Sequence, residues 1–154
     1  MSLLGLYKKF QSYPLGNTLF SHVVCFRAPY FGSVKPKLQS LEPGKAVVTF
    51  KRRRAVQNHI GTVHVIAICN ALEMAMGMCA EASIPNDLRW LPKSMSVSYP
   101  AKSHTKVITA VATVDPAAFE ADKDVPIKVQ AMRDDGTVVV EGEITLWVTA
   151  KPSR

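Results

Sequence analysis

Hydrophobic positions gather in the middle of the chain, between two parts with shorter patterns. Fifteen of the eighteen positions in residues 63–80 are apolar or glycine, and the exceptions are His64, Asn70 and Glu73. This run continues to about residue 84 and is followed by Pro85, which predicts a long helix buried in the core. Carboxylates are almost never fully buried without a partner, so Glu73 calls for an explanation.

The part before this run predicts two short helices and a hairpin. Apolar residues at positions 3, 6, 7 and 10 have helical spacing, and a second helix is expected over residues 17–26. Pro29, Gly32 and Pro36 then interrupt the pattern. The segments 37–41 and 45–53 are extended and are joined by Glu42-Pro43-Gly44, which has turn chemistry.

The part after the run predicts four strands, over residues 94–99, 106–114, 125–132 and 138–149. Asp135-Gly136 is expected to form the hairpin turn between the last two. A long apolar helix among antiparallel strands must be wrapped by a curved sheet or shared with a second subunit. The expected class is therefore α+β with a hotdog fold, comprising a helical extension over residues 1–33 and a hotdog domain over residues 34–154.

Composition and net charge limit the classes of binding partner and the cellular compartment that are expected. The chain has 154 residues and a formal net charge of +7, which favours an anionic partner such as nucleic acid, a membrane surface, an acidic protein or a phosphate-bearing small molecule. Cys25, Cys69 and Cys79 lie in apolar surroundings without a Cys-x-x-Cys pair, which predicts buried thiols and a cytoplasmic location. The apolar N-terminal stretch is too short for a signal peptide, and Glu73 in the middle of the apolar run argues against a membrane span.

A short motif opens the apolar run. Its residues are Asn58, Gly61, Thr62 and His64, followed nine positions later by the acid Glu73. This pattern resembles the active-site motif of hotdog-fold acyl-CoA thioesterases of the phenylacetate-pathway type. Residues 95–101 are similar to the strand that follows the helix in that family. Val65-Ile66 stands where the family usually has Gly-Gly, and the acid in the family is often aspartate.

The resemblance implies hydrolysis of an acyl-CoA or acyl-carrier-protein thioester, with coenzyme A present only as part of the substrate. Glu73 is expected to act as general base or nucleophile, and His64 to orient the substrate. A helix that begins near Thr62 would offer the Gly61 and Thr62 amides to the developing oxyanion. Asn58 is expected either in the same site or simply as a helix cap.

Helix geometry separates these groups within one chain. Glu73 follows Thr62 by eleven residues, which is about 16 Å along a helix at 1.5 Å per residue. The acid and the donors therefore meet on one carbonyl only if they come from two subunits. We expect a homodimer, or a dimer of such dimers, with a composite site at the interface.

Basic residues near the motif suggest how the rest of the substrate is bound. Arg53, Arg54 and Lys102 are expected to hold the phosphates of coenzyme A, although a charge run such as residues 51–54 is also typical of a solvated strand end. Asn70 and Tyr99 are expected next to the substrate. The run lacks the aromatic residues of single-strand nucleic-acid binders, and the four histidines show no metal-binding spacing.

Two other functions remain open from the sequence. A hotdog dehydratase or hydratase would need a histidine and an acid acting together, but the His-x-x-Gly-x-Pro entry expected from that family is absent. A non-catalytic acyl-CoA-binding module would use the same pocket without turnover.

Overall fold

The structure is a computed structural model that describes residues 2–152. Three helices come first: α1 (Leu3–Gln11), α2 (Gly16–Arg27) and the short α3 (Pro29–Gly32). The hairpin of β1 (Lys37–Glu42) and β2 (Lys45–Lys51) is followed by the short 3₁₀ helix η1 (Arg54–Val56) and then by α4 (Val65–Ser83). The remaining elements are β3 (Leu88–Ser98), β4 (Val107–Thr113), the short 3₁₀ helix η2 (Pro116–Ala118), β5 (Lys123–Arg133) and β6 (Val138–Ala150).

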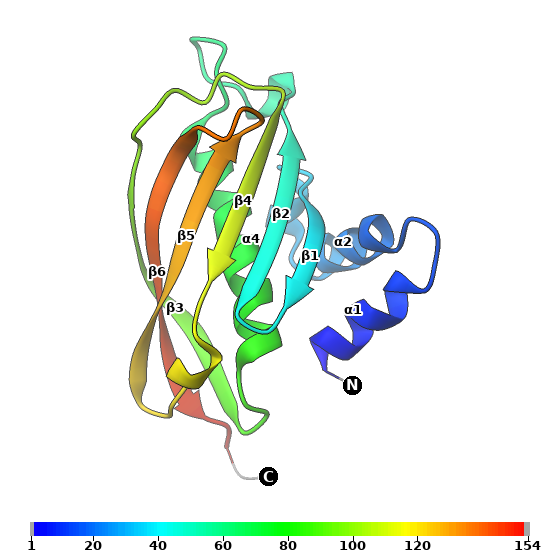
Figure 1. Cartoon of the computed structure of the whole chain (residues 1–154), viewed down its shortest axis with the longest axis vertical. Helices are drawn as coiled ribbons and strands as arrows, with labels where there is room; N and C mark the ends of the chain where they lie inside the picture. The colour runs from blue at the N-terminus through cyan, green and yellow to red at the C-terminus, as the bar shows by residue number, and fades with distance from the viewer. Residues whose placement is uncertain (1, 153–154) are drawn as a thin grey trace.

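The six strands form one antiparallel sheet in the order β1-β2-β4-β5-β6-β3. The sheet curves around α4, and α1 and α2 lie beyond the β1 edge (Figure 1). Alternate residues of each inner strand point toward the helix, as in β2, where Ala46, Val48 and Phe50 are buried. This is the predicted hotdog fold of class α+β.

Helix α4 is buried along most of its length. It is long and apolar enough to cross a membrane by length and composition, but 61% of its most apolar window lies inside the protein. Leu72, Met74, Ala75 and Met76 are at most 1% exposed. The sheet therefore covers this helix as the core helix of the fold.

Strand β3 begins earlier than its sequence pattern predicts, at Leu88 instead of residue 94. Pro92 makes this stretch look unlike a strand, because proline donates no hydrogen bond to a ladder. β3 lies at the edge of the sheet and pairs only with β6, and its register shifts between Pro92 and Ser94. An edge position and a register shift are the settings in which a strand tolerates proline.

The N-terminal helices cover the other edge of the sheet. The Ser21 hydroxyl of α2 accepts a hydrogen bond from the backbone N–H of Leu38 at 2.8 Å, and Asn17 Nδ2 donates to the carbonyl of Gln39 at 2.9 Å. Tyr7 of α1 packs edge-on against Phe20 of α2 with ring centroids 5.2 Å apart. These contacts satisfy the exposed backbone of β1 and protect that edge from pairing with another chain.

The three cysteines are free thiols. Cys69 and Cys79 are buried in α4, as predicted, whereas Cys25 in α2 is only half-buried. Burial raises the pKa of all three thiols, and that of Cys79 to about 11. They are therefore neutral at pH 7 and are poor nucleophiles.

Candidate functional site

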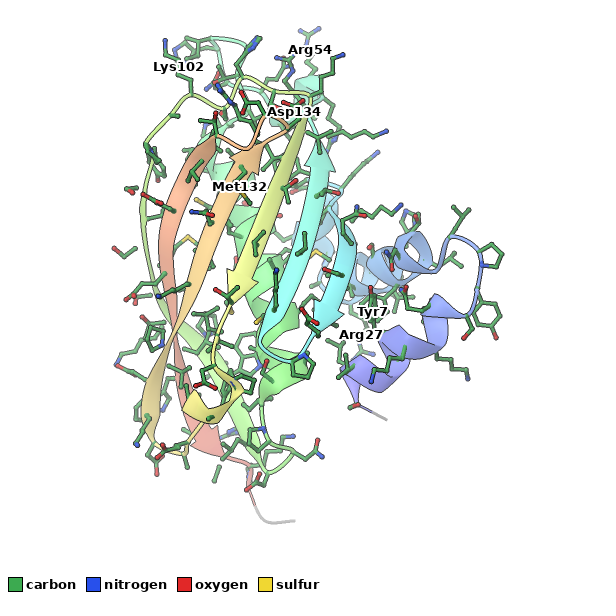
Figure 2. The ribbon with its side chains drawn as sticks, in the orientation of Figure 1. Tyr7, Arg27, Arg54, Lys102, Met132 and Asp134 are labelled. Atoms are coloured by element: carbon green, nitrogen blue, oxygen red, sulfur yellow. The ribbon has the colours of Figure 1, made fainter. Side chains whose placement is uncertain are left out.

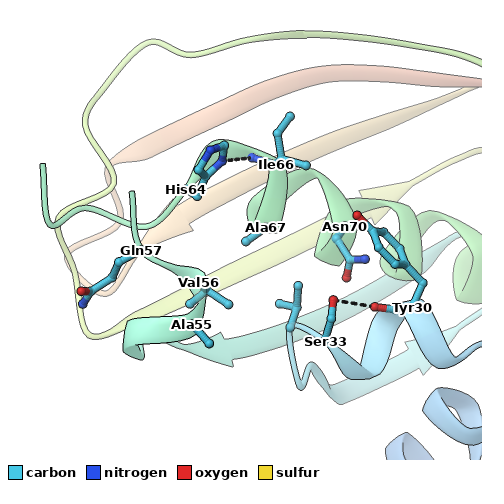
Figure 3. A pocket seen from close by; sticks show the side chains of 10 residues that line it. Tyr30, Ser33, Ala55, Val56, Gln57, His64, Ile66, Ala67 and Asn70 are labelled. Atoms are coloured by element: carbon cyan, nitrogen blue, oxygen red, sulfur yellow. Dashed lines mark hydrogen bonds between the residues drawn. The ribbon is translucent and has the colours of Figure 1, made fainter. Parts of the chain in front are cut away.

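Helix α4 begins at Val65, three residues later than the pattern predicts, and His64 is its cap. The imidazole Nδ1 accepts a hydrogen bond from the N–H of Ile66 at 3.2 Å (Figure 3). The expectation that Asn58 caps this helix is therefore wrong. Because Nδ1 is the acceptor, a neutral His64 ring carries its proton on Nε2, and the residue is exposed.

Asn58 instead closes a tight loop before the helix. Its Oδ1 accepts from the N–H groups of Ile60 at 3.2 Å and Thr62 at 3.1 Å, and its Nδ2 donates to Thr62 Oγ1 at 2.8 Å. The N–H of Gly61 donates to the carbonyl of Asn58 at 3.1 Å. Gly61 adopts φ of 77°, which glycine accommodates without strain.

The Gly61 and Thr62 amides are therefore already hydrogen-bonded, and the expectation that they are free donors in the first helical turn is wrong. The N–H of Val65 is the donor left over at this end of α4, because it has no hydrogen-bond partner within residues 2–152. It lies at the positive end of the helix dipole. Val65 is one of the two positions at which the family usually has glycine, and that departure is the signal that could have identified it.

A cleft of about 320 Å³ brings several predicted residues together at this end of α4. Those in its lining are Asn58, Thr62, His64, Tyr99 and Lys102, together with Val65. The loop that carries Lys102 is held in place by Ser103, whose hydroxyl donates to the Val63 carbonyl at 2.6 Å. The cleft therefore combines a free amide donor, an imidazole and a cation on fixed backbone.

Glu73 lies in a different cleft. It is half-buried, and it lines a hollow of about 280 Å³ with Pro92, Lys93 and Met95 of β3. Eight residues separate it from Val65, which is about 12 Å along the helix axis. One chain therefore does not bring Glu73 and the Val65 amide to one carbonyl.

The carboxylate of Glu73 has neither a hydrogen bond nor an ion pair with any residue that the structure describes. Lys93 lines the same cleft but pairs with Asp124 at 2.6 Å. A structural ion pair therefore does not account for this acid. His64 and Glu73 line separate clefts, so one subunit does not place them together on a β-hydroxyacyl chain as a dehydratase requires.

Asn70 lies about one helical turn before Glu73 on α4. It is 5% exposed, and both polar atoms of its side chain lack a hydrogen-bond partner within the described part of the chain. A cavity of about 220 Å³ beside it is also lined by His64, Tyr30 and Ser33, and Figure 3 shows the amide beside the last two. An unpaired buried amide typically costs about 1–3 kcal/mol, so this group is poised for a ligand atom.

The three cations expected to bind phosphates do not form one cluster. Arg54 and Lys102 lie at the end of the molecule where α4 begins (Figure 2). Arg53 instead donates from Nη2 to the carbonyl of Ser33 and lines a separate cleft beneath α2. No group of three His, Cys, Asp or Glu side chains that could hold a metal ion occurs among residues 2–152.

Comparison with known proteins places this geometry in context. The sequence profile of a family described as "Domain of unknown function (DUF4442)" matches residues 16–148. No curated protein matches the chain. A structural-genomics protein, APC5556, is 39% identical with a TM-score of 0.83, and the match covers 97% of this chain and 99% of that one.

Two similar structures carry thioesterase names. PA5026 from Pseudomonas aeruginosa, described as a probable thioesterase, is 17% identical with a TM-score of 0.77, and the match covers 90% of this chain and 97% of that one. A hypothetical thioesterase from Streptococcus pneumoniae TIGR4, solved with coenzyme A, is 18% identical with a TM-score of 0.63 over 77% of this chain and 91% of that one. At these identities the likeness concerns the fold.

Proposed function

We propose that this chain, which belongs to the DUF4442 family of domains of unknown function, is an acyl-CoA thioesterase with a composite site between two subunits. The observation that carries this proposal is Glu73, a half-buried carboxylate without a partner among residues 2–152. Similar folds named thioesterases, one of them solved with coenzyme A, support a thioesterase-type function.

In the proposed reaction Glu73 accepts a proton from water as the water oxygen attacks the thioester carbonyl carbon. The carbonyl oxygen gains negative charge and accepts a hydrogen bond from the N–H of the partner subunit's Val65. The carbon–sulfur bond then breaks, and Glu73 returns the proton to the leaving thiolate. The products are the free thiol of coenzyme A and a carboxylic acid, which releases its proton to the solvent. Direct attack by the Glu73 carboxylate, followed by hydrolysis of the anhydride, would give the same products.

The edge strand β3 supports the second subunit in this proposal. It pairs with β6 on one side only, and Leu91 and Met95 are 67% and 39% exposed. A long exposed edge with apolar side chains is a surface that pairs readily with another chain. The cleft of Glu73 is lined by this strand, so a second copy paired at β3 would lie next to the acid.

The remaining predicted residues take supporting roles in the proposal. The unpaired amide of Asn70 and the Nε2 of His64 would orient the substrate. Arg54, Lys102 and Tyr99 surround the end of α4 where the phosphates and pantetheine chain would enter. Arg53 lies apart from Lys102 and lines a separate cleft, so this proposal assigns it no phosphate.

The first experiment is turnover of a panel of acyl-CoA substrates, followed by release of free thiol. We expect hydrolysis of at least one substrate by the parent protein and none above background by Glu73→Gln. Binding of coenzyme A esters without thiol release would instead identify the non-catalytic binding module.

The composite site is tested by mixing two inactive variants. Glu73→Ala removes the acid, and Val65→Pro removes the amide hydrogen while placing proline at the first helical position, which proline prefers. Heterodimers contain one site with both defects and one with neither, so up to half of the parental activity per heterodimer should return. A mixture that stays inactive although heterodimers form would place the whole site within one subunit.

A further inference from the structure

A cleft of about 700 Å³ opens between α2 and the hairpin of β1 and β2, and its lining shares no residue with the clefts of Val65 and Glu73. It arises because β1 begins at Lys37, opposite Thr49, whereas β2 continues to Lys51. The chain before β1 turns away through Lys35, whose φ is 57°. The gap left beside the end of β2 is roofed by α2, which contributes Thr18, Ser21, His22 and Cys25 to the lining.

The floor of this cleft is mainly apolar. Val34, Pro36 and Phe50 line it and are buried, and Cys25 and Val107 are half-buried. A floor of this kind gains free energy when an apolar group displaces water from it. It is therefore suited to a hydrocarbon chain.

The rim is cationic. Lys35, Lys37 and Lys51 are exposed there beside the half-buried Arg53, and no acidic residue lines the cleft. None of the four forms an ion pair with another residue in the described range 2–152. The sequence before Glu42 contains no acid at all. Four cations without a counter-charge favour an anionic group at this rim.

Arg53 adds a specific donor to this general attraction. Its Nη2 donates to the Ser33 carbonyl, whereas its Nε is buried without a hydrogen-bond partner among residues 2–152. A buried guanidinium N–H without an acceptor is costly, and an oxygen of a carboxylate or phosphate is the acceptor that it binds best.

We propose that this cleft is a second ligand site, which binds an amphipathic anion with one hydrocarbon chain. The chain occupies the apolar floor, and a carboxylate or phosphate head group binds Arg53 and the rim lysines. The site does not depend on the thioesterase proposal, since none of its residues takes part in the hydrolysis itself. A small polar anion would leave the apolar floor in contact with water. A neutral lipid would leave the four cations without a counter-charge.

The test is isothermal titration of the full chain with dodecanoate below its micelle concentration at low salt. We expect saturable binding that weakens by about fourfold for each methylene removed on going to decanoate and octanoate. Dodecyl phosphate in a parallel titration distinguishes the two head groups. Equal or tighter binding of dodecyltrimethylammonium would overturn the proposal, because the rim would then select no charge.

Variants assign the binding to this cleft. Lys37→Glu combined with Lys51→Glu should weaken dodecanoate binding roughly tenfold or more, because each charged hydrogen bond is lost and replaced by repulsion. Cys25→Trp, which fills the cleft, should weaken binding as well. The matched control is Lys128→Glu on another exposed strand position, which should bind like the parent.

Glu73→Gln and Val65→Pro separate this proposal from that of the thioester site. Both should keep parental affinity for dodecanoate even where hydrolysis is lost. Loss of binding in these variants but not in the lysine variants would place the ligand at the thioester site and overturn the second site. Displacement of dodecanoate by free coenzyme A, which has no hydrocarbon chain, would overturn it as well.

Discussion

The start and the middle of α4 differ in how their polar groups are satisfied. In the loop before the helix, Asn58 makes three side-chain hydrogen bonds, and His64 caps the first turn. In the middle, Asn70 is buried without a partner, and Glu73 has no ion pair within residues 2–152.

This difference distinguishes the residues that stabilise the fold from those that are available to bind or act on a substrate. A buried or half-buried polar group with all its bonds made stabilises the fold, whereas one without partners lowers stability and is retained for another reason. We therefore assign Asn58 and Thr62 mainly to holding the loop, and Glu73, Asn70 and the Val65 amide to the substrate. The following predictions test that division, from the largest effect to the smallest.

Glu73→Gln should lower kcat for thioester hydrolysis by about 10²- to 10⁴-fold, because the base is lost, while the thermal midpoint stays close to that of the parent. The measurement is free thiol release at saturating acyl-CoA, together with a melting curve. Glu81→Gln is the matched control, since Glu81 lies two turns further along α4 and its Oε1 accepts from Trp90 at 2.8 Å. Parental turnover in Glu73→Gln would refute the assignment.

Val65→Pro should lower kcat by roughly 10²- to 10³-fold, the usual effect of losing one oxyanion donor. The backbone of His64, with φ of −65° and ψ of 131°, is compatible with a following proline. Val65→Ala keeps the amide and should retain most of the activity. If the proline and alanine variants are equally active, the Val65 amide does not bind the oxyanion.

Asn58→Ala should lower the free energy of unfolding by about 1–3 kcal/mol, because the N–H groups of Ile60 and Thr62 lose their acceptor. Urea denaturation measures this change. Asn86→Ala, at an exposed loop position, is the control with little expected effect. A large loss of kcat in Asn58→Ala, with stability unchanged, would instead give this residue a chemical role.

Asn70→Leu should leave stability unchanged or raise it by up to about 2 kcal/mol, because an unpaired buried amide is replaced by an apolar group of similar size. The KM for the substrate should rise, since the proposed orienting contact is lost. Denaturant unfolding and steady-state kinetics give the two quantities. Destabilisation together with an unchanged KM would show that the amide serves the fold.

Asp135→Asn should have the smallest effect, and that effect should depend on pH. The side chain of Arg133 binds the Asp135 carboxylate at 2.6 Å and holds its pKa at about 2, below its ordinary value. A lowered folded-state pKa contributes stability above about pH 4, which is lost as the pH falls toward 2. The melting temperatures of parent and variant should therefore differ slightly at pH 7 and converge near pH 2. A difference that persists at pH 2 would show that the ion pair is not its cause.

Much of the fold could be predicted because it follows from local patterns. The apolar run identified α4 as the core helix, and strand-forming residues bounded by turn signals identified β2, β4, β5 and β6. Pro92 concealed the first half of β3, because a strand that tolerates proline is recognised only from its place at the sheet edge. The start of α4 was misplaced by three residues, since the Asn58 loop satisfies its own backbone before the helix begins.

The sequence by itself determined the hotdog outline and the identity of Glu73 as an acid in an apolar helix, since periodicity and composition are local properties. Tertiary structure decided which amide at the helix start is free. The N–H groups of Gly61 and Thr62 donate to Asn58, so neither is available to a substrate. It also separated Arg53 from Lys102, because Arg53 donates to the carbonyl of Ser33 and lines the cleft next to α2, whereas Lys102 lines the cleft at the start of α4. The Asn58 loop leads into Val63, whose N–H donates to the carbonyl of Ser103, and Arg53 donates to the carbonyl of Ser33. These contacts join segments distant in the chain, which no local pattern contains.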